Sequence, residues 1–372
     1  NLAEDQTKAL DKLPIAKRMR WGERSDEFVR PVKWFLMMLD GEVVDAEIFG
    51  LRSGNCSYGH RFHAPGKLEL SNASDYEELL LTQGMVMASF DQRRDSIREL
   101  VEQAALRLGG EVHIDTGLLD EVTALVEYPA VVCGEFDSSF LELPAEVLVT
   151  TMQENQRYFA LFDPEGRLLP HFISIANIDS RKPAVVAGGN ERVIRPRFAD
   201  AEFFFSQDRK QGLMQMRERL DTVVFQTKLG SIGDKTRRIA RLAGEIAHRI
   251  GADAGLVSRA ADLCKADLMS DMVGEFPKLQ GIMGRYYAAL QGEESTVCDA
   301  VEQHYWPRHA GDRLPLSALA QSIALADRLD SLIGIFAIGE KPGGDKDPFA
   351  LRRHALGVVR MLNDPFYRNW VV

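Results

Sequence analysis

The sequence predicts a multidomain α+β protein in which a mixed N-terminal half precedes an all-helical C-terminal part. Two observations predict this fold class. Early in the chain, apolar runs flank the dipeptide Asp40-Gly41, which is a strong hairpin signal because both residues tolerate a positive φ. From Leu229 onward, apolar residues recur at spacings of three and four, which is the period of helices packed on a core.

The composition is that of a globular protein. The chain has 372 residues, of which 45% are hydrophobic and 27% are charged, enough for two or three cores. It contains neither a long apolar run nor a signal-peptide pattern, so we expect no membrane association. The four cysteines are scattered, which argues against zinc and disulfides and favours a cytoplasmic protein. The net charge of −10 disfavours nonspecific coating of nucleic acid but leaves a local basic patch open.

The N-terminal part is expected to hold strands over 34–39 and 42–50, helices over 75–83 and 91–109, and a strand over 130–133. His60 and His63 lie in the motif GHRFHAPG, but neither a carboxylate nor a cysteine completes a metal-ligand spacing. A polar loop is therefore favoured over a ligand site.

The middle of the chain resembles a second small α+β unit. Pro144 suits the first turn of a helix that fades near Asn155. Strands are expected over 157–162 and 171–178, joined by a turn. These patterns predict three domains, over residues 1–142, 143–222 and 223–372.

Three arginines crowd the segment that follows. Pro196 suits the first position of a helix, so Arg192, Arg195 and Arg197 are expected at a helix start, where the helix dipole disfavours cations. A compensating anion is expected. Either a nearby carboxylate, Asp200 or Glu202, or a nucleic-acid phosphate meets this need, and both interpretations stay open.

The C-terminal part is expected to be helical. A capping box at 231–234 opens the first helix, and others are expected over 254–272, 279–289, 295–305, 316–338 and 348–362. Asp267, Asp271 and Glu275 recur every four residues and would share one side of a continuous helix. The segment GSIGDKT is rejected as a phosphate-binding loop because its glycine spacing is wrong and Asp234 precedes the lysine.

The last helix is expected to start with Asp347 as its cap and Pro348 as its first residue. Arg352, Arg353 and Arg360 can then lie near one face. Phosphate binding and a solvated basic face are both open for these arginines.

Four strings carry a family resemblance: GNERVIRPRFADAEFFFSQDRK, KLGSIGDKT, KADLMSDMVGEFPKLQGIMGRYYA and GDKDPFALRRHALGVVR. With them the chain resembles, from about Leu13 to Arg360, the β subunit of bacterial heterotetrameric glycyl-tRNA synthetase. Residues 363–372 match no part of that pattern. The resemblance implies a fragment that lacks the family's N-terminal part and its C-terminal anticodon-binding region.

The resemblance further implies an N-terminal half related to domains of the phenylalanyl-tRNA synthetase β subunit. It implies that glycine is activated in a separate α subunit and that the assembled α2β2 enzyme uses ATP and magnesium. It also implies that this chain alone is inactive and has neither a catalytic residue nor a cofactor of its own. Its role would be to bind the acceptor arm of tRNA(Gly) and the α subunit. The candidate tRNA-binding residues are Arg192, Arg195, Arg197, Lys210, Lys265, Arg285, Lys346, Arg352, Arg353 and Arg360.

The helical part also resembles the HD superfamily, whose metal sites use a His, a His-Asp pair and a later Asp. The motif LADRLD places the last ligand at Asp327, but Ala266 precedes Asp267 at the paired position, and the first His position falls near Lys235. Both imidazoles are missing, so we expect an HD-like fold without a metal. A metal-dependent HD phosphohydrolase and a trans-editing hydrolase of mischarged tRNA remain the alternatives.

Overall fold

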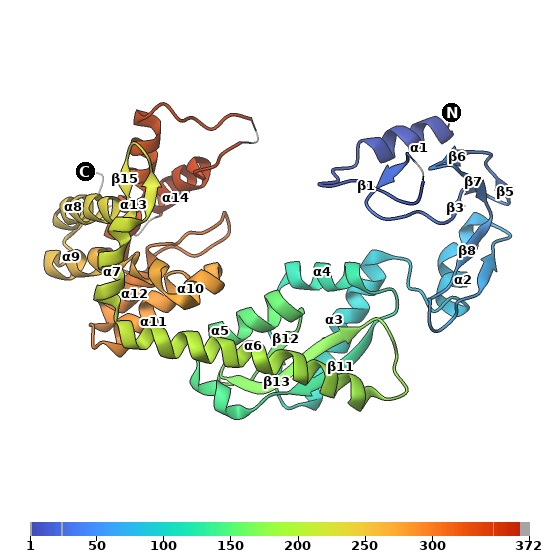
Figure 1. The fold of residues 1–372 in the computed structure, drawn as a ribbon, viewed down its shortest axis with the longest axis horizontal. Helices are drawn as coiled ribbons and strands as arrows, with labels where there is room; N and C mark the ends of the chain where they lie inside the picture. Colours follow the sequence, from blue (N-terminus) through green and yellow to red (C-terminus); the bar gives the residue numbers. More distant parts are fainter. Residues whose placement is uncertain (1, 24, 345, 365–372) are drawn as a thin grey trace. The chain divides into compact units, whose positions relative to one another are not determined.

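The computed structural model describes residues 2–23, 25–344 and 346–364 (Figure 1). By packing, the chain divides into two compact units. The first comprises Asn1–Asp137 and Met152–Ile194, and the second comprises Ser138–Thr151 and Arg195–Val372. The chain starts in the first unit, passes to the second at Ser138, returns to the first at Met152 and passes to the second again at Arg195. Neither unit is therefore one continuous range of residues. The expected division into three domains falls at other places and stays a prediction.

The core of the first unit is an antiparallel sheet in the order β10-β12-β13-β11, covered by two helices. Its strands are β10 (Glu111–Val112), β12 (Phe159–Phe162), β13 (Leu168–Ala176) and β11 (Ala130–Glu135), and its helices are α3 (Phe90–Arg107) and α4 (Thr116–Leu125). Ile97, Leu119 and Ile173 are fully buried between the layers. Gly134 allows close packing there, because a Cβ atom would lie 2.3 Å from the Phe172 ring.

The N-terminal segment of the first unit forms small sheets. Its elements are α1 (Leu2–Asp11), β1 (Met19–Arg20), β2 (Glu27–Phe28), β3 (Phe35–Leu36), β4 (Met38–Leu39), β5 (Glu42–Val43), β6 (Glu47–Ile48), β7 (Leu51–Gly54), β8 (Cys56–Tyr58), β9 (Lys67–Glu69) and α2 (Tyr76–Thr82). The hairpin at Asp40-Gly41 is confirmed, with Asp40 at a φ of 51°. The two long strands expected around it are wrong. The Ser53 hydroxyl bonds to Val44 O and Ala46 N, which interrupts the ladder, and β3 pairs in parallel with β7.

The second unit is mostly helical, as expected. Its helices are α5 (Ala145–Thr150), α7 (Leu213–Arg219), α8 (Ile232–Ile250), α9 (Ala254–Leu263), α10 (Asp271–Glu275), α11 (Ile282–Leu290), α12 (Ser295–Gln303), α13 (Ala318–Ala337) and α14 (Leu351–Asn363), with a short pair of strands, β14 (Val224–Gln226) and β15 (Gly230–Ser231). The capping box of α8 is confirmed. Helix α13 packs against α8, α9, α12 and α14 and forms the centre of the unit.

The helix expected over 254–272 is wrong. Helix α9 ends at Leu263, a 3₁₀ turn covers Ala266–Met269, and Ser270 is extended before α10 begins. Ser270 interrupts the helix because its hydroxyl accepts a hydrogen bond from the Val273 amide and caps α10. The carboxylates of Asp267, Asp271 and Glu275 therefore do not share one helix face.

The helix start expected at Pro196 is also wrong. Helix α6 runs from Pro183 to Gln211 with Pro196 inside it. The buried residues Ile194, Phe198 and Ala201 continue one apolar face across the proline, and burial of that face holds the helix together. Arg192, Arg195 and Arg197 therefore lie in mid-helix, away from the positive end of the helix dipole.

The last helix, α14, begins at Leu351, three residues after the expected first position at Pro348. The capping role of Asp347 is retained, since its carboxylate accepts hydrogen bonds from the amides of Leu351 (2.8 Å) and Arg352 (2.9 Å). Residues 365–372 lie outside the described residues. Among the described helices, none is both long and apolar enough to span a bilayer.

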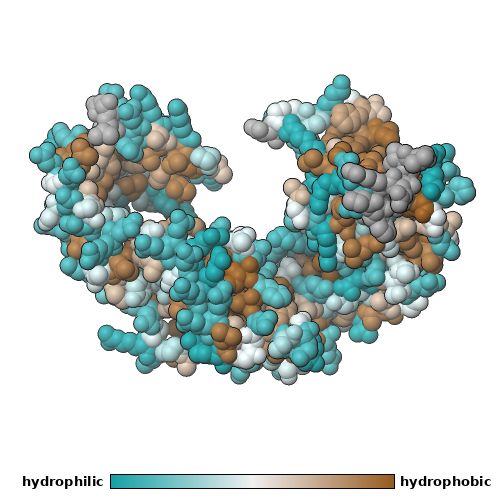
Figure 2. Space-filling model, turned by 180° about the vertical axis from the view of Figure 1, so that it is seen from behind, coloured by the Kyte–Doolittle hydropathy of each residue, from teal (hydrophilic) through white to brown (hydrophobic). Residues whose placement is uncertain are grey.

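Hydrophobic and hydrophilic residues are mixed over the face shown in Figure 2. Large apolar side chains that are more than half exposed include Phe203 (57%) on α6, Ile333 (65%) on α13 and Leu356 (58%) on α14. Such scattered exposure is ordinary for protein surfaces and does not by itself mark a binding site.

Candidate functional site

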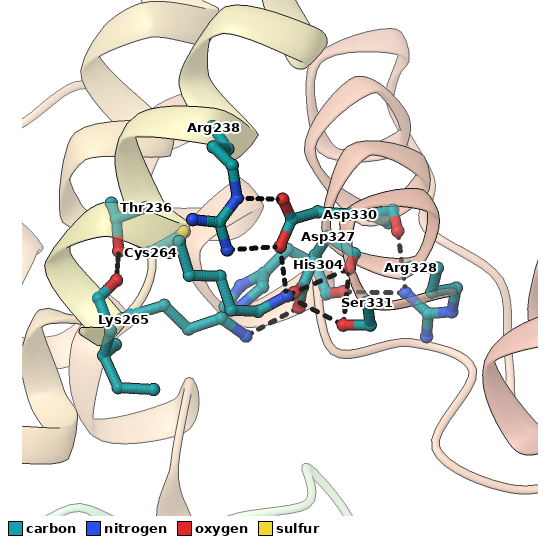
Figure 3. A network of polar contacts seen from close by, with 12 residues as sticks. Thr236, Arg238, Cys264, Lys265, His304, Asp327, Arg328, Asp330 and Ser331 are labelled. Carbon is teal, nitrogen blue, oxygen red and sulfur yellow. Dashed lines mark hydrogen bonds and ion pairs between the residues drawn. The ribbon is translucent and has the colours of Figure 1, made fainter. Parts of the chain in front are cut away.

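Two lysines and two aspartates form a buried cluster in the second unit (Figure 3). The Nζ atom of Lys235, on α8, lies 2.8 Å from Asp327 Oδ1 and 3.1 Å from Asp330 Oδ2, both on α13. The Nζ atom of Lys265 lies 2.7 Å from Asp327 Oδ2. Lys235 also donates to the Ser331 hydroxyl at 2.7 Å. One carboxylate thus meets two ammonium groups in what we call the lysine–aspartate cluster: Lys235, Lys265, Asp327 and Asp330.

The charges of this cluster compensate one another. Burial alone would raise the pKa of Asp327, but the ammonium groups of Lys235 and Lys265 outweigh it and hold that pKa well below its usual value. Asp330 receives further hydrogen bonds from the Arg238 guanidinium, at 2.5 and 3.2 Å. Both aspartates are therefore paired with cations in the interior, which is the arrangement that makes buried charge tolerable.

Asp267 is fully buried and holds the start of α11. Its Oδ2 atom accepts hydrogen bonds from the amides of Gly281 (2.5 Å) and Gly284 (2.9 Å). Gly284 permits this approach, because a Cβ atom there would lie 3.1 Å from that oxygen and 2.7 Å from Val301. Burial raises the pKa of Asp267 to about 6, and the two amide hydrogen bonds only partly oppose that rise.

The residues at the positions of an HD metal site do not fit a metal ion. Asp327 is already paired with Lys235 and Lys265, Ala266 offers only a methyl group, and the Oδ2 atom of Asp267 is engaged by two backbone amides. Within the described ranges, no three His, Cys, Asp or Glu residues come together as metal ligands. The cation that a metal would supply beside Asp327 is supplied here by lysine side chains.

Lys265, one of the candidates for tRNA binding, is not available at the surface. It is buried (6% exposed), it pairs with Asp327, and its Nζ lies 4.0 Å from the centroid of the Tyr305 ring. Reaching a phosphate would require it to leave a buried carboxylate uncompensated. The sequence contained no sign of this pairing, because Lys265 and Asp327 are 62 residues apart.

The sequence also did not identify His304 and Arg328, which lie beside the lysine–aspartate cluster. The Nδ1 atom of His304 donates to Val301 O at 2.6 Å, and burial lowers the pKa of His304 well below its usual value. The Arg328 guanidinium donates to the carbonyl groups of His304, Tyr305 and Pro307 at 3.0 to 3.1 Å and ties the end of α12 to α13. The sequence could not identify these contacts, because every residue has a backbone carbonyl group and the identity of the partner residue is therefore not informative.

Two more of the candidate cations hold the fold together. Arg285, on α11, is half-buried and forms ion pairs with Glu302 (2.6 Å) and Glu146 (3.0 Å). Arg360, on α14, donates to the carbonyl groups of His309 (3.1 Å) and Asp312 (2.6 Å). Both guanidinium groups thus already have protein partners, and their role in tRNA binding stays a prediction.

The remaining candidates are exposed. Arg192, Arg195, Arg197 and Lys210 lie on α6, and none of them pairs with a carboxylate of a described residue. The carboxylate partners considered for them, Asp200 and Glu202, do not supply a pair. Arg192 belongs to the first unit, and the other three belong to the second.

Lys346, Arg352 and Arg353 are exposed at the start of α14. Arg353 also lines a small cavity of about 200 Å³ together with Arg360 and His309. Arg352 lies close to Asp347, whose pKa is lowered mainly by the hydrogen bond from the Arg352 amide. Neither the Arg352 nor the Arg353 guanidinium forms an ion pair or a hydrogen bond with a described residue.

The loop conformation expected for GHRFHAPG is confirmed, and both histidines have structural partners. His60 is buried (1% exposed), and its Nε2 donates to Asn177 O at 2.7 Å. The Nε2 atom of His63 accepts a hydrogen bond from the Asp179 amide at 3.0 Å.

Comparison with known proteins gives one consistent result. Residues 1–368 match the protein family described as "Glycyl-tRNA synthetase beta subunit". The chain is 51% identical to the glycine–tRNA ligase beta subunit of Stutzerimonas stutzeri over 95% of its own length and 52% of that protein, and 50% identical to that of Hahella chejuensis over 95% and 51%. The chain thus spans about half the length of these relatives.

A solved structure, Bacillus subtilis YpgQ, covers 43% of this chain and 86% of its own, with 22% sequence identity and a TM-score of 0.27. A similarity at this level carries no argument about this chain.

Proposed function

We propose, from the premise that this chain belongs to the glycyl-tRNA synthetase beta subunit family, that it is the part of a two-subunit ligase that holds tRNA(Gly). The partner is an α subunit that activates glycine with ATP and magnesium, in an α2β2 assembly. This chain contributes binding of the acceptor arm and of the α subunit. On this proposal the first unit is related to domains of the phenylalanyl-tRNA synthetase β subunit, and the second is an HD-like helical domain without hydrolase chemistry.

The observation that carries the tRNA-binding role is the set of exposed cations without carboxylate partners. The chain has a net charge of −10, so binding of a polyanion depends on cations that are available locally. Arg195, Arg197 and Lys210 on α6 are exposed, and so is Arg353 on α14. None of the four forms an ion pair with a carboxylate of a described residue. Guanidinium groups suit phosphate oxygens because they donate two parallel hydrogen bonds.

The alternatives have less support. A metal-dependent phosphohydrolase needs a metal site, and the lysine–aspartate cluster neutralises the carboxylate that such a site would use. A trans-editing hydrolase needs a nucleophile or an activated water, and no residue described above supplies either role. We therefore expect the isolated chain to be inactive in ATP–pyrophosphate exchange, and glycine-dependent exchange above background would contradict this expectation.

The test of the proposal is tRNA(Gly) affinity across a salt series in the assembled enzyme, with the variants Arg195→Ala and Arg353→Ala. Each phosphate contact that is lost should weaken binding and reduce the slope of log affinity against log salt by roughly 0.7 to 0.9. The matched control is Arg241→Ala, an exposed arginine on α8 outside both groups, which should leave the slope unchanged. If both test variants retain wild-type affinity and slope and melt earlier, these arginines are structural.

A further inference from the structure

The N-terminal segment of the first unit contains a pocket of about 790 Å³. Residues of the segment 28–34 and of the loop 58–65 line it, together with Glu127. This volume is within the range of roughly 300 to 1,000 Å³ that is typical of sites for small ligands. The four strings quoted above for the family resemblance and the tRNA-binding candidates include none of its lining residues.

The pocket concentrates positive charge. Arg30, Lys33 and Arg61 line it, all three are exposed, and none forms an ion pair with a carboxylate of a described residue. Glu127 is the one acidic residue of the lining. Three cations against one carboxylate, in a chain whose net charge is −10, indicate a ligand that carries negative charge.

The pocket also exposes aromatic faces. Trp34 is 44% exposed and Tyr58 is 40% exposed, although both are large side chains that a fold usually covers. Their ring centroids are 4.8 Å apart with an angle of 55° between the planes. Exposed rings beside unpaired cations are the combination with which proteins hold single-stranded nucleic acid, because bases stack on the rings while phosphates meet the cations.

The wall that presents Arg61 is held in place by buried hydrogen bonds. His60 Nδ1 accepts from the amides of Phe62 (3.3 Å) and His63 (3.2 Å), so its Nε2 carries the proton that is donated to Asn177 O. The Asn177 side chain in turn accepts from the Glu127 amide at 2.6 Å. Asn177 thus fixes two parts of the pocket lining, and the motif GHRFHAPG serves to shape the pocket.

We infer that this pocket binds a single-stranded segment of RNA, with a base stacked against Trp34 and Tyr58 and phosphates on Arg30, Lys33 and Arg61. The inference rests on the proposed function, since it supplies a contact to the RNA that the enzyme handles. Glu127 is suited to accept hydrogen bonds from base amino groups. An acidic peptide would satisfy the cations but would leave the rings without a stacking partner.

The experiment measures binding of fluorescein-labelled hexa-adenylate RNA to the complete enzyme by fluorescence anisotropy, with tRNA(Gly) binding measured in parallel. Trp34→Ala should weaken hexa-adenylate binding about five- to a hundredfold, because one stacked base contributes that much. Arg61→Ala should weaken it and lower the salt slope by roughly 0.7 for one lost phosphate contact. The control Arg52→Ala removes an exposed arginine of β7 outside the pocket and should change neither.

A spectroscopic measurement separates stacking from indirect effects. Hexa-adenylate should quench part of the tryptophan fluorescence, and Trp34→Phe should abolish that part while it retains most of the affinity. If neither Trp34→Ala nor Arg61→Ala differs from Arg52→Ala, the pocket inference is overturned. It is also overturned if hexa-glutamate displaces the RNA at equal concentration, which would indicate a protein partner. If the wild-type enzyme binds hexa-adenylate but does not bind tRNA(Gly), the proposed function is contradicted instead.

Discussion

At the scale of single residues, Lys235 and Lys265 bring two positive charges to the buried carboxylate of Asp327. An unpaired carboxylate at this depth would be strongly disfavoured, because burial removes the water that stabilises its charge. The two lysines come from different segments, so the cluster also links α8 and the end of α9 to α13. The positive charge beside Asp327 thus comes from lysine side chains of the protein itself and not from an ion bound from solution.

Replacing Lys235 by methionine should therefore destabilise the protein substantially. The change keeps the apolar stem but leaves Asp327 with one ammonium group fewer, and we expect a loss of about 3–5 kcal/mol in the free energy of unfolding. Chemical denaturation measures this loss. The matched control is Arg237→Met, two residues along the same helix, whose ion pairs to Asp221 and Asp234 are exposed and contribute little. Equal effects of the two changes would show that burial of the cluster is unimportant.

Asp267 should make the stability of the protein depend on pH, because burial raises its pKa, whereas the pKa of Asp327 is lowered. Its pKa is about 6 in the folded protein, above the unfolded value, so the folded state binds more protons between pH 4 and 6. Its contribution to stability is complete below pH 4 and is lost as the pH rises through 6.

The isosteric change Asp267→Asn removes this titration. The stability of the variant relative to wild type should rise by about 3 kcal/mol between pH 4 and pH 6.5 and stay constant above that. Thermal or urea unfolding of both proteins across this pH range measures the difference. A difference that does not change with pH would show that Asp267 ionises normally.

At the scale of elements, α6 is a long helix that tolerates a proline in its interior. Pro196 cannot donate the amide hydrogen bond of its position, and its ring crowds the preceding turn. The buried side chains Ile194, Phe198 and Phe205 offset this loss by packing on one face. Helix propensity alone would end the helix there, and tertiary packing continues it.

Pro196→Ala should consequently stabilise the protein. Restoring the amide and relieving the crowding should add about 1–2 kcal/mol to the free energy of unfolding, after allowance for the more flexible unfolded chain. The control is Pro183→Ala at the first position of the same helix, where proline is well tolerated and the change should have little effect. A destabilising effect of Pro196→Ala would indicate that α6 needs the proline for its local shape.

At the scale of the whole molecule, the chain builds two units whose cores share few residues. The core of the first unit includes Ile97, Leu119 and Phe159, whereas Ala324 and Met361 belong to a core of the second. The core of the first unit draws on residues before and after the segment 138–151, whereas the named core of the second unit lies within Arg195–Val372.

A cavity in one core should therefore loosen one unit. Leu119→Ala in the first core should cost about 2–5 kcal/mol, and hydrogen exchange should accelerate in the first unit, including β12 and β13, which lie far from it in sequence. Exchange in α8 and α13 should stay close to wild type. Lys235→Met provides the reciprocal control, with faster exchange in the second unit. Equal acceleration in both units would show that they unfold as one cooperative body.

The sequence by itself was sufficient for the local features and for the family. The hairpin at Asp40-Gly41, the capping box at 231–234 and the helical second unit follow from turn chemistry, capping and apolar period, all of which act over a few residues. The family follows from long strings that match over residues 1–368. The exposed arginines of α6 were identified as candidates for the same reason: charge and spacing are visible in the sequence.

Only the tertiary structure decided which charges are available and where helices end. Lys265 and Arg285 look like Arg353 in a sequence, but they pair with carboxylates 62 and 139 residues away, and Lys265 is buried. The aromatic and basic residues around Trp34 come together only after the loop with His60 is tied to Asn177, 117 residues later. Long-range pairing depends on which surfaces the fold brings together, and no local pattern contains that information.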